Sequence, residues 1–242
     1  MKFSVLQWNV WYKESNQNIV EFLREQDADI ICLQELTIEE GKSGHAPQYI
    51  AEQLGYEYYF KEIDLGDGVP KLANGIFSRF PVKDTKVTWI NEPVGTGGYD
   101  DEYRALIQAT ITMGDKKIVI GTTHMSYTHR FEITSRKLQE TELLVDEIAK
   151  HTNNFILTGD LNVTPDSPTI KSLEKYLKNA SPDYQAPTWT TKPFSYNGFE
   201  ETELKWRLDY IFSTPDLRLL SSEVLSTDYS DHLPVLSWFE IN

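Results

Sequence analysis

Short apolar runs, separated by polar or glycine-containing stretches, recur along nearly the whole chain. Several of them are uninterrupted, which is typical of β-strands that are covered on both faces. The runs predict strands at residues 3–8, 29–34, 56–61, 73–78, 83–90, 104–112, 117–123, 154–159, 208–213 and 234–239. Residues 113–116, which read Met-Gly-Asp-Lys, are predicted to join two of these strands as a hairpin.

Apolar residues at helical spacing occur between the predicted strands. They predict helices around residues 19–23, 49–54 and 131–148, the last being the most regular. Ser167-Pro168 pairs a capping residue with a proline at the first helical position, so 168–178 is predicted as a short helix. Two long irregular stretches, 91–102 and 181–206, remain. Loops of such length in a compact domain are usually functional.

The composition describes a globular chain. Its 242 residues are 40% apolar, which is enough for a sizeable core and argues against intrinsic disorder. The single cysteine, Cys32, excludes an intrachain disulfide and is expected to be a buried, inert apolar residue. The sequence becomes polar at Gln7, and no stretch approaches the roughly 18 apolar residues of a membrane span. We therefore expect a soluble, cytoplasmic protein without a membrane span, monomeric and without an obligate protein partner.

The charge balance limits the class of substrate. Acidic side chains outnumber basic ones by 37 to 23, for a net charge of −14. Duplex nucleic acid is bound through neutralisation of its phosphates by lysine and arginine, and a strongly acidic surface opposes this at long range. No basic strip is visible in the sequence, because Arg130, Arg136 and Lys137 are interleaved with acids.

Two short motifs near the end of the chain carry the candidate chemistry. Gly159-Asp160-Leu161-Asn162 and Ser230-Asp231-His232-Leu233-Pro234 each place a carboxylate beside a second polar group next to a predicted buried strand. Either one alone is more typical of a capped turn. Four further segments repeat the pattern, in which an apolar run ends in a side chain able to bind a metal or a phosphate: residues 7–10, 33–35, 122–124 and 207–211. Together they indicate hydrolysis of a phosphate ester.

This ordered set resembles the endonuclease/exonuclease/phosphatase superfamily, which has the deoxyribonuclease I-like fold. The resemblance extends from about Phe3 to Phe239. It implies an α/β protein, a four-layer α/β sandwich in which two packed mixed β-sheets are flanked by helices, formed by one domain over residues 1–242. It also implies a divalent cation, Mg²⁺ or Mn²⁺, which prefers oxygen ligands.

The resemblance assigns a role to each matching side chain. Glu35 and Asp231 match metal ligands, with Asn9 beside them. Asp160 matches the group that aligns or deprotonates the attacking water, and Asn162 matches a hydrogen-bond donor to the phosphate. His232 matches an imidazole on the phosphate.

Further positions complete the predicted site. Asp209 matches the carboxylate that orients His232, and His124 matches a second histidine on the phosphate, with Asn74 as its polar neighbour. Arg104 is expected to bind the substrate, although an ion pair with Glu102 or Asp101 is an alternative. Histidines 45, 129 and 151 match nothing and are expected at the solvated surface.

The expected activity is metal-assisted hydrolysis of a phosphodiester by in-line attack of water, as in a nuclease or a small-diester phosphodiesterase. Its substrate is expected to be a phosphate ester such as a short or single-stranded nucleic acid. A sphingomyelin, phospholipid or inositol-phosphate phosphoesterase is the alternative within catalysis. A non-catalytic binding domain that keeps the fold is the alternative outside it, and the presence of every site residue argues against it.

Overall fold

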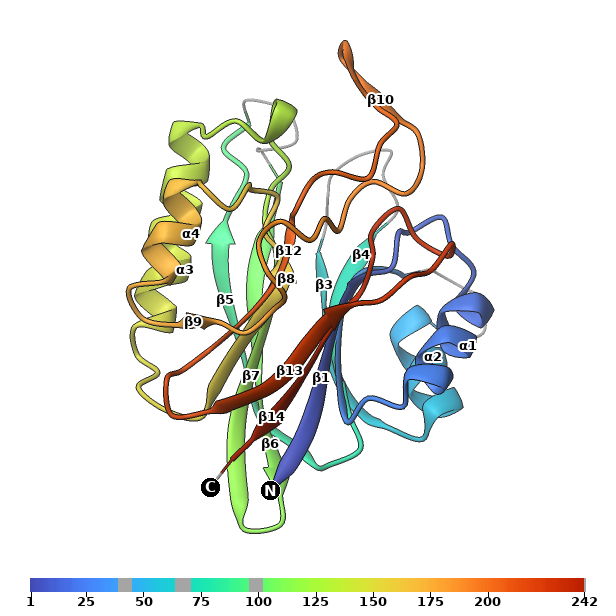
Figure 1. Ribbon diagram of the computed structural model, residues 1–242, viewed down its shortest axis with the longest axis vertical. Coiled ribbons are helices and arrows are strands. Elements are labelled where there is room, and N and C mark those ends of the chain that lie inside the picture. The colour runs from blue at the N-terminus through green and yellow to red at the C-terminus, as the bar shows by residue number, and fades with distance from the viewer. Residues whose placement is uncertain (39–44, 64–70, 96–101, 242) are drawn as a thin grey trace.

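The computed structural model describes residues 1–38, 45–63, 71–95 and 102–241. In this part of the chain two six-stranded mixed sheets pack face to face (Figure 1). The first sheet has the strand order β13 (Arg218–Val224), β14 (Val235–Glu240), β1 (Lys2–Asn9), β2 (Ile30–Thr37), β4 (Leu72–Ser78) and β3 (Glu57–Ile63). The second has the order β5 (Val82–Asn91), β6 (Arg104–Met113), β7 (Lys116–His124), β8 (Phe155–Asp160), β12 (Asp209–Ser213) and β9 (Lys178–Asn179).

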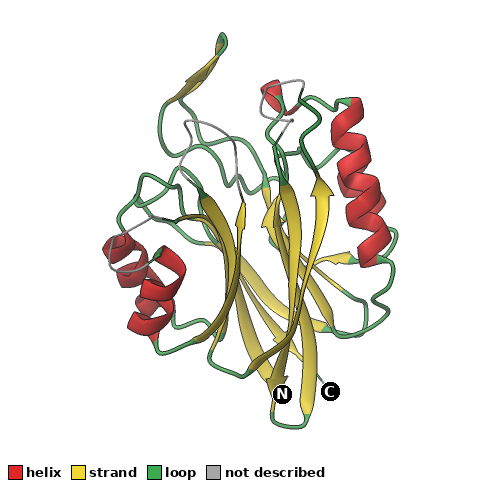
Figure 2. Cartoon of the chain, turned by 180° about the vertical axis from the view of Figure 1, so that it is seen from behind, coloured by secondary structure: helices red, strands yellow, loops and turns green. Residues whose placement is uncertain are grey.

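Helices cover the outer face of each sheet, as the view from behind also shows (Figure 2). Helices α1 (Asn16–Gln26) and α2 (Ala46–Leu54) pack on the first sheet. Helices α3 (Ser135–Ile148) and α4 (Pro168–Leu173) pack on the second. The predicted four-layer α/β sandwich is therefore confirmed.

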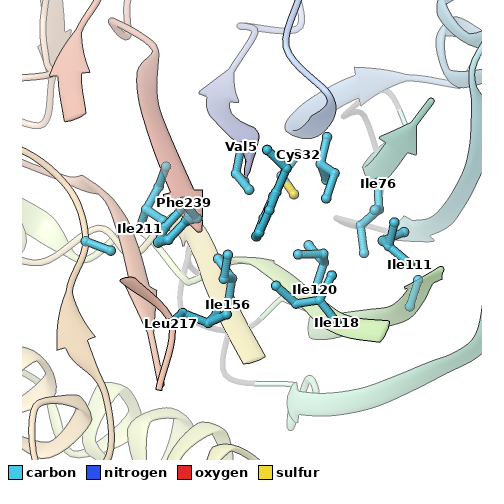
Figure 3. Packing of buried hydrophobic residues seen from close by; sticks show 14 of the residues in the cluster. Val5, Cys32, Ile76, Ile111, Ile118, Ile120, Ile156, Ile211, Leu217 and Phe239 are labelled. Carbon is cyan, nitrogen blue, oxygen red and sulfur yellow. The ribbon is translucent and has the colours of Figure 1, made fainter. Parts of the chain in front are cut away.

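The central core lies between the two sheets (Figure 3). Val5, Cys32 and Ile76 of the first sheet face isoleucines of the second, among them Ile120 and Ile156, and all five are fully buried. Burying one such aliphatic side chain stabilises a fold by about 1.5–3 kcal/mol. Burial also raises the pKa of the Cys32 thiol to about 12, so it stays protonated and inert, as the sequence predicts.

Most of the predicted strands occur within one or two residues of their predicted bounds, and the predicted hairpin joins β6 to β7. The prediction of a helix from residue 131 was wrong at its start, because α3 begins at Ser135 behind the capping side chain of Thr134. Residues 129–131 form a separate 3₁₀ turn in which Arg130 and Phe131 have positive φ. Helix α4 ends at Leu173 rather than at 178, and Lys178–Asn179 pairs with β12 instead.

The predicted irregular stretch 181–206 was also wrong in part. It contains a hairpin made of β10 (Phe194–Tyr196) and β11 (Phe199–Glu201), which projects beyond the sheets (Figures 1 and 2). Strand β13 has no apolar run because it is a largely exposed edge strand, so the sequence pattern misses it. Of the other irregular stretch, 91–102, residues 96–101 lie outside the described part of the chain.

Candidate active site

Four strand ends from the two sheets bring most of the predicted site together. β1 and β2 run parallel, with Asn9 paired to Gln34, one residue before Glu35. β7 and β8 also run parallel, with His124 paired to Asp160. Because parallel strands end at the same edge of a sheet, their terminal side chains converge. With the loop before β14, they line a cavity of about 540 Å³.

The end of β8 depends on a glycine. A Cβ atom at Gly159 would lie 2.2 Å from the carbonyl oxygen of Thr123 on the neighbouring strand. No other residue type fits at that distance, so the glycine lets β7 and β8 approach closely at His124 and Asp160. The next polar side chain, Asn162, adopts a left-handed conformation with φ 48°. Asparagine tolerates this better than most residues.

Asn9 links the two sheets at the cavity. Its Nδ2 donates hydrogen bonds to Oε1 of Glu35 at 3.0 Å and to Oδ2 of Asp160 at 3.1 Å. The other carboxylate oxygen of Glu35 accepts from the backbone N–H of Tyr12 at 3.2 Å. Glu35 has φ 60° and lies where the register between β2 and β4 shifts. This β-bulge turns its side chain out of the regular alternation of the strand.

His232 lies between two carboxylates. Its Nδ1 is 2.8 Å from Oδ2 of Asp209, and its Nε2 is 3.6 Å from Oδ2 of Asp160. Burial alone would lower the pKa of His232, but the charges of Asp209, Asp160 and Asp231 outweigh it and hold this pKa well above the ordinary value. The histidine is therefore a cation at neutral pH, and Asp209, fully buried behind it, fixes the ring.

The pKa of Asp160 is raised above that of an ordinary surface carboxylate. Burial raises its pKa to about 7, the nearby cationic His232 lowers it, and Asp209 raises it. Its Oδ1 accepts a hydrogen bond from the backbone N–H of Asn162 at 3.0 Å, so both oxygens are held in place. A carboxylate whose pKa lies near neutrality can accept a proton and release it again.

His124 and Arg104 form the second flank of the cavity. The Nε2 of His124 is 3.5 Å from Oδ2 of Asp160 and 3.1 Å from Nδ2 of Asn162. Burial, together with the charges of Arg104, His232 and Lys137, lowers the pKa of His124 well below its ordinary value, so this imidazole is neutral. Arg104 is buried and paired with Glu102, which realises the ion pair considered from the sequence while leaving Arg104 on the cavity wall.

A buried polar network supports these groups from below. Gln7 donates to Oδ1 of Asp209 at 3.2 Å and exchanges hydrogen bonds with Gln34, which donates to Thr122 at 2.9 Å. Gln7, Gln34 and Asp209 are fully buried, and the network crosses between the sheets. A satisfied buried network of this kind holds its members in one arrangement.

The residues predicted to hold a metal fit a hard cation. Glu35 and Asp231 both line the cavity, and the charge of Asp231 adds to burial in raising the pKa of Glu35. Oδ2 of Asp231 accepts from the indole N–H of Trp189 at 3.2 Å, whereas its Oδ1 is buried without a hydrogen-bond partner among the described residues. Two close carboxylates with a spare oxygen are the donor set that Mg²⁺ or Mn²⁺ prefers.

A second cluster of donor atoms lies next to this set. Ligand atoms of Asp160, Asp209 and His232 lie within 4.8 Å of one another. His232 already uses Nδ1 to bind Asp209, which leaves a poorer set of free donors than Glu35 and Asp231 offer.

Aromatic side chains form one wall of the cavity. Region 181–206 of the sequence is rich in aromatic residues. Only the fold shows that these residues contact the segment that follows β7. The aromatic wall comprises Tyr127, Phe131, Trp189, Phe194 and Tyr196. Trp11, Tyr12 and Lys13 also line the cavity, as does Lys192, which comes shortly before strand β10 of the hairpin. None of these positions was predicted as a site residue, because aromatic residues equally well belong to the core.

Asn74 is a predicted site residue that the structure does not bring to the cavity wall. It is buried within β4, and its Nδ2 has no hydrogen-bond partner among the described residues. Of the histidines expected at the surface, His129 is exposed. The expectation was wrong for His45 and His151, which are half-buried, and His151 stacks on Phe155 with ring centroids 4.2 Å apart.

Comparison with known proteins identifies the family of this chain. Residues 6–232 match the Endonuclease/Exonuclease/phosphatase family. The chain belongs to this family. An exodeoxyribonuclease of Bacillus subtilis (strain 168) is 24% identical, and the match covers 96% of this chain and 97% of that protein.

Solved structures share the fold. An endonuclease/exonuclease/phosphatase from Beutenbergia cavernae has a TM-score of 0.79 at 22% identity, covering all of this chain and 72% of that one. D. rerio TDP2, solved with a single-strand DNA product, has a TM-score of 0.72 at 18% identity, covering 99% of each chain. Family membership supports a hydrolase of phosphate esters. No helix in the described residues is long and apolar enough to cross a membrane.

Proposed function

We propose that this protein is a divalent-metal-dependent phosphodiesterase that hydrolyses a short or single-stranded nucleic acid, or a diester of similar size. The observation that carries the proposal is the position of Asp160. Its Oδ2 lies 3.5 Å from His124 and 3.6 Å from the Asp209-bound His232, at a cavity that Glu35 and Asp231 also line.

Asp160 acts as the general base. Hydrogen bonds from Asn9 and from the backbone of Asn162 aim its oxygens, and its pKa of about 7 matches proton transfer near neutral pH. Water attacks the phosphorus in line with the leaving oxygen. Its proton passes to Asp160 as the new P–O bond forms and the bond to the leaving oxygen breaks.

Donors on both flanks stabilise the charge that develops on the phosphate. The cationic His232 donates from Nε2, and Asp209 keeps it protonated and oriented. Asn162 and Arg104 offer N–H groups from the second sheet, and neutral His124 lies between them and Asp160. These groups are held before substrate arrives, so little reorganisation is required during the reaction.

Glu35 and Asp231 would hold the divalent cation, with Asn9 beside Glu35. Such a cation, when bound, polarises a phosphate oxygen and stabilises the charge of the leaving oxygen. The acceptor-only oxygen donors favour Mg²⁺ or Mn²⁺ over Zn²⁺, which prefers sulfur and nitrogen ligands at structural sites.

The cavity walls support a substrate with a flat group beside the phosphate. The aromatic wall offers stacking surfaces, and base stacking on aromatic side chains contributes about 1–3 kcal/mol per base. Besides Arg104 and the cationic His232, Lys13 and Lys192 are the cations that line the described part of the cavity, a small number that matches the net charge of −14. One or two phosphates, rather than a long duplex, match this arrangement.

Hydrolysis of bis(p-nitrophenyl) phosphate tests the catalytic proposal. We expect turnover with Mg²⁺ or Mn²⁺, its loss with a chelator, and its near-absence in the His232→Ala protein. Turnover that chelation leaves unchanged would contradict the metal-dependent mechanism. No turnover of any ester by the folded protein would favour a binding domain instead.

A substrate screen tests the finer proposal. Short single-stranded DNA, RNA, sphingomyelin and inositol phosphates should be compared at equal concentration. We expect the single-stranded nucleic acids to be cleaved with the highest kcat/KM. A higher kcat/KM for sphingomyelin or an inositol phosphate would retain the phosphoesterase and replace its substrate.

A further inference from the structure

Helix α3 carries a lysine that is completely buried next to the active site. Lys137 lies in the first turn of the helix and has no exposed surface. Lysine is almost never fully buried unless it is paired. Burial lowers the pKa of Lys137 to about 8, against the attraction of Glu140, which lies one turn along the helix.

The ammonium group of Lys137 binds two separate stretches of backbone. Its Nζ donates to the carbonyl oxygen of Ser126 at 2.6 Å and to that of Leu161 at 3.0 Å. Glu140 completes the arrangement, because its Oε1 accepts from the backbone N–H of Ser126 at 3.0 Å, and its Oε2 lies 3.8 Å from Nζ.

Both stretches directly follow residues of the proposed chemistry. Ser126 comes two positions after His124, and Leu161 comes immediately after Asp160. The regular pairing of β7 with β8 ends at His124 and Asp160. Beyond it, buried backbone groups need other partners. Lys137 and Glu140 supply partners for Ser126 and Leu161, so the ion pair joins the two stretches just beyond the regular pairing.

The connection continues to the substrate side. Nδ2 of Asn162 donates to the carbonyl oxygen of Met125 at 3.1 Å, and the N–H of Met125 donates to the carbonyl oxygen of Asp160 at 2.9 Å. A shift of either stretch would therefore change the aim of Asn162 and the distance between His124 and Asp160. Neither Lys137 nor Glu140 lines the cavity.

We propose that Lys137 and Glu140 are positioning residues that fix His124, Asp160 and Asn162 relative to one another for the reaction. This inference rests on the proposed phosphodiesterase function. It assigns the pair an effect on turnover through geometry, since misplacing a reacting group by about 1 Å can lower a rate about a hundredfold.

Paired substitutions separate positioning from simple stabilisation. Lys137→Met alone leaves the Glu140 carboxylate buried without its cation, which is expected to destabilise the fold. Lys137→Met with Glu140→Gln removes that charge and keeps an acceptor for the N–H of Ser126. We expect the double variant to regain most of its thermal stability yet to show a kcat about 10- to 100-fold below that of the wild type. KM should change by less than about threefold.

A control pair lies at the C-terminal end of the same helix, with Glu147 in its last turn and Lys150 two residues beyond it. Lys150 and Glu147 form an ion pair with the same i, i+3 spacing at 2.6 Å, but Lys150 is largely exposed. Lys150→Met with Glu147→Gln should leave kcat unchanged. Lys137→Arg keeps a cation with several donors. When this variant folds, we expect its kcat to lie between those of the double variant and the wild type.

Two results would overturn the proposal. One is a double variant whose kcat returns to within about threefold of wild type as its stability returns. The other is a crystal structure of that variant in which the 3.5 Å separation of His124 and Asp160 and the bond from Asn162 to Met125 are unchanged. The crystallographic result also decides the question if the wild type hydrolyses no ester, an outcome that would defeat the proposed function alone.

Discussion

The two sheets contribute opposite chemistry to one cavity. The first sheet and its loops bring Glu35 and Asp231 together, and burial and the second carboxylate raise the pKa of Glu35. The second sheet and helix α3 bring His124 close to Arg104 and Lys137, and burial and these cations, together with His232, lower the pKa of His124. The first sheet thus contributes an acidic side with Glu35 and Asp231, and the second contributes a basic side with His124 and Arg104, although the second sheet also carries Asp160 and Asp209.

This difference indicates what each side binds. Neighbouring like charges are unfavourable in a buried place unless an ion of opposite charge joins them. The acidic side thus suits a cation, and the basic side suits a phosphate. His232 connects them, because it follows Asp231 in the loop before β14 and binds Asp209 of β12.

The largest effect is expected from Asp160, which lies close to both His124 and His232. Asp160→Asn keeps the size of the side chain and its bond to Asn162 but removes the base. Turnover should fall by about a thousandfold, within the range expected for a general base. Steady-state kinetics at saturating Mn²⁺ measures it. Asp166→Asn, on an exposed loop shortly after β8, is the control and should behave as wild type.

His232→Ala should lower turnover by about a hundredfold or more, because it removes a preorganised donor. Circular dichroism should show that the fold is retained. The exposed His129→Ala provides a matched histidine deletion without loss of activity. A folded His232→Ala protein that keeps more than a tenth of its turnover would make His232 a structural residue.

Substitutions on the acidic side should act through the cation. Glu35→Gln and Asp231→Asn are each expected to raise the Mn²⁺ concentration for half-maximal activity by about 10- to 100-fold, with partial recovery at high metal. Calorimetry should show parallel losses of metal binding. Tight Zn²⁺ binding by the wild type, or unchanged Mn²⁺ dependence in both variants, would contradict a Mg²⁺ or Mn²⁺ site at Glu35 and Asp231.

Lys137, the buried cation of helix α3, should make the free energy of unfolding depend on pH. Lys137 has a pKa of about 8 in the folded protein against 10.5 ordinarily, so between these values the unfolded chain holds more protons. Stability then increases with pH, by about 1 kcal/mol from pH 8 to pH 9. Urea unfolding should show this increase relative to the Lys137→Met, Glu140→Gln double variant. If the free energy of unfolding depends on pH equally in the two proteins, the pKa of Lys137 is not lowered in the folded state.

The smallest expected effect concerns salt. If the cavity binds one phosphate of a single strand, raising salt from about 50 to about 200 mM should weaken binding only about two- to threefold. Cleavage of short single strands measured across this range tests it. Efficient nicking of supercoiled plasmid that moderate salt suppresses strongly would reveal a basic groove instead.

The fold class could be predicted because its evidence is local. Continuous apolar runs such as 29–34 and 154–159 have to be covered on both faces, and they became the central strands β2 and β8. Strand β13 and the hairpin of β10 and β11 escaped prediction because they are edge or projecting elements. Their apolar residues are few, or they pack only after the chain has folded.

The candidate site was predictable in its members more than in its connections. Motifs such as Gly159-Asp160-Leu161-Asn162 indicate the chemistry as members of an ordered set, because each alone is more typical of a capped turn. Nothing in the sequence shows that Lys137 is buried against Ser126 and Leu161. The sequence shows only that Lys137 is interleaved with acids, one of which, Glu140, is its buried partner.

The sequence by itself determined most of the segments that become strands and which side chains can bind a metal or a phosphate, because both follow from local pattern and residue chemistry. Only the tertiary structure decided the protonation states. Asp160 and Glu35 have raised pKa values, His124 a lowered one and His232 a raised one, through burial and through charges far apart in the sequence. Electrostatic interactions depend on distance in space and on exclusion of water, and neither exists until the two sheets have packed together.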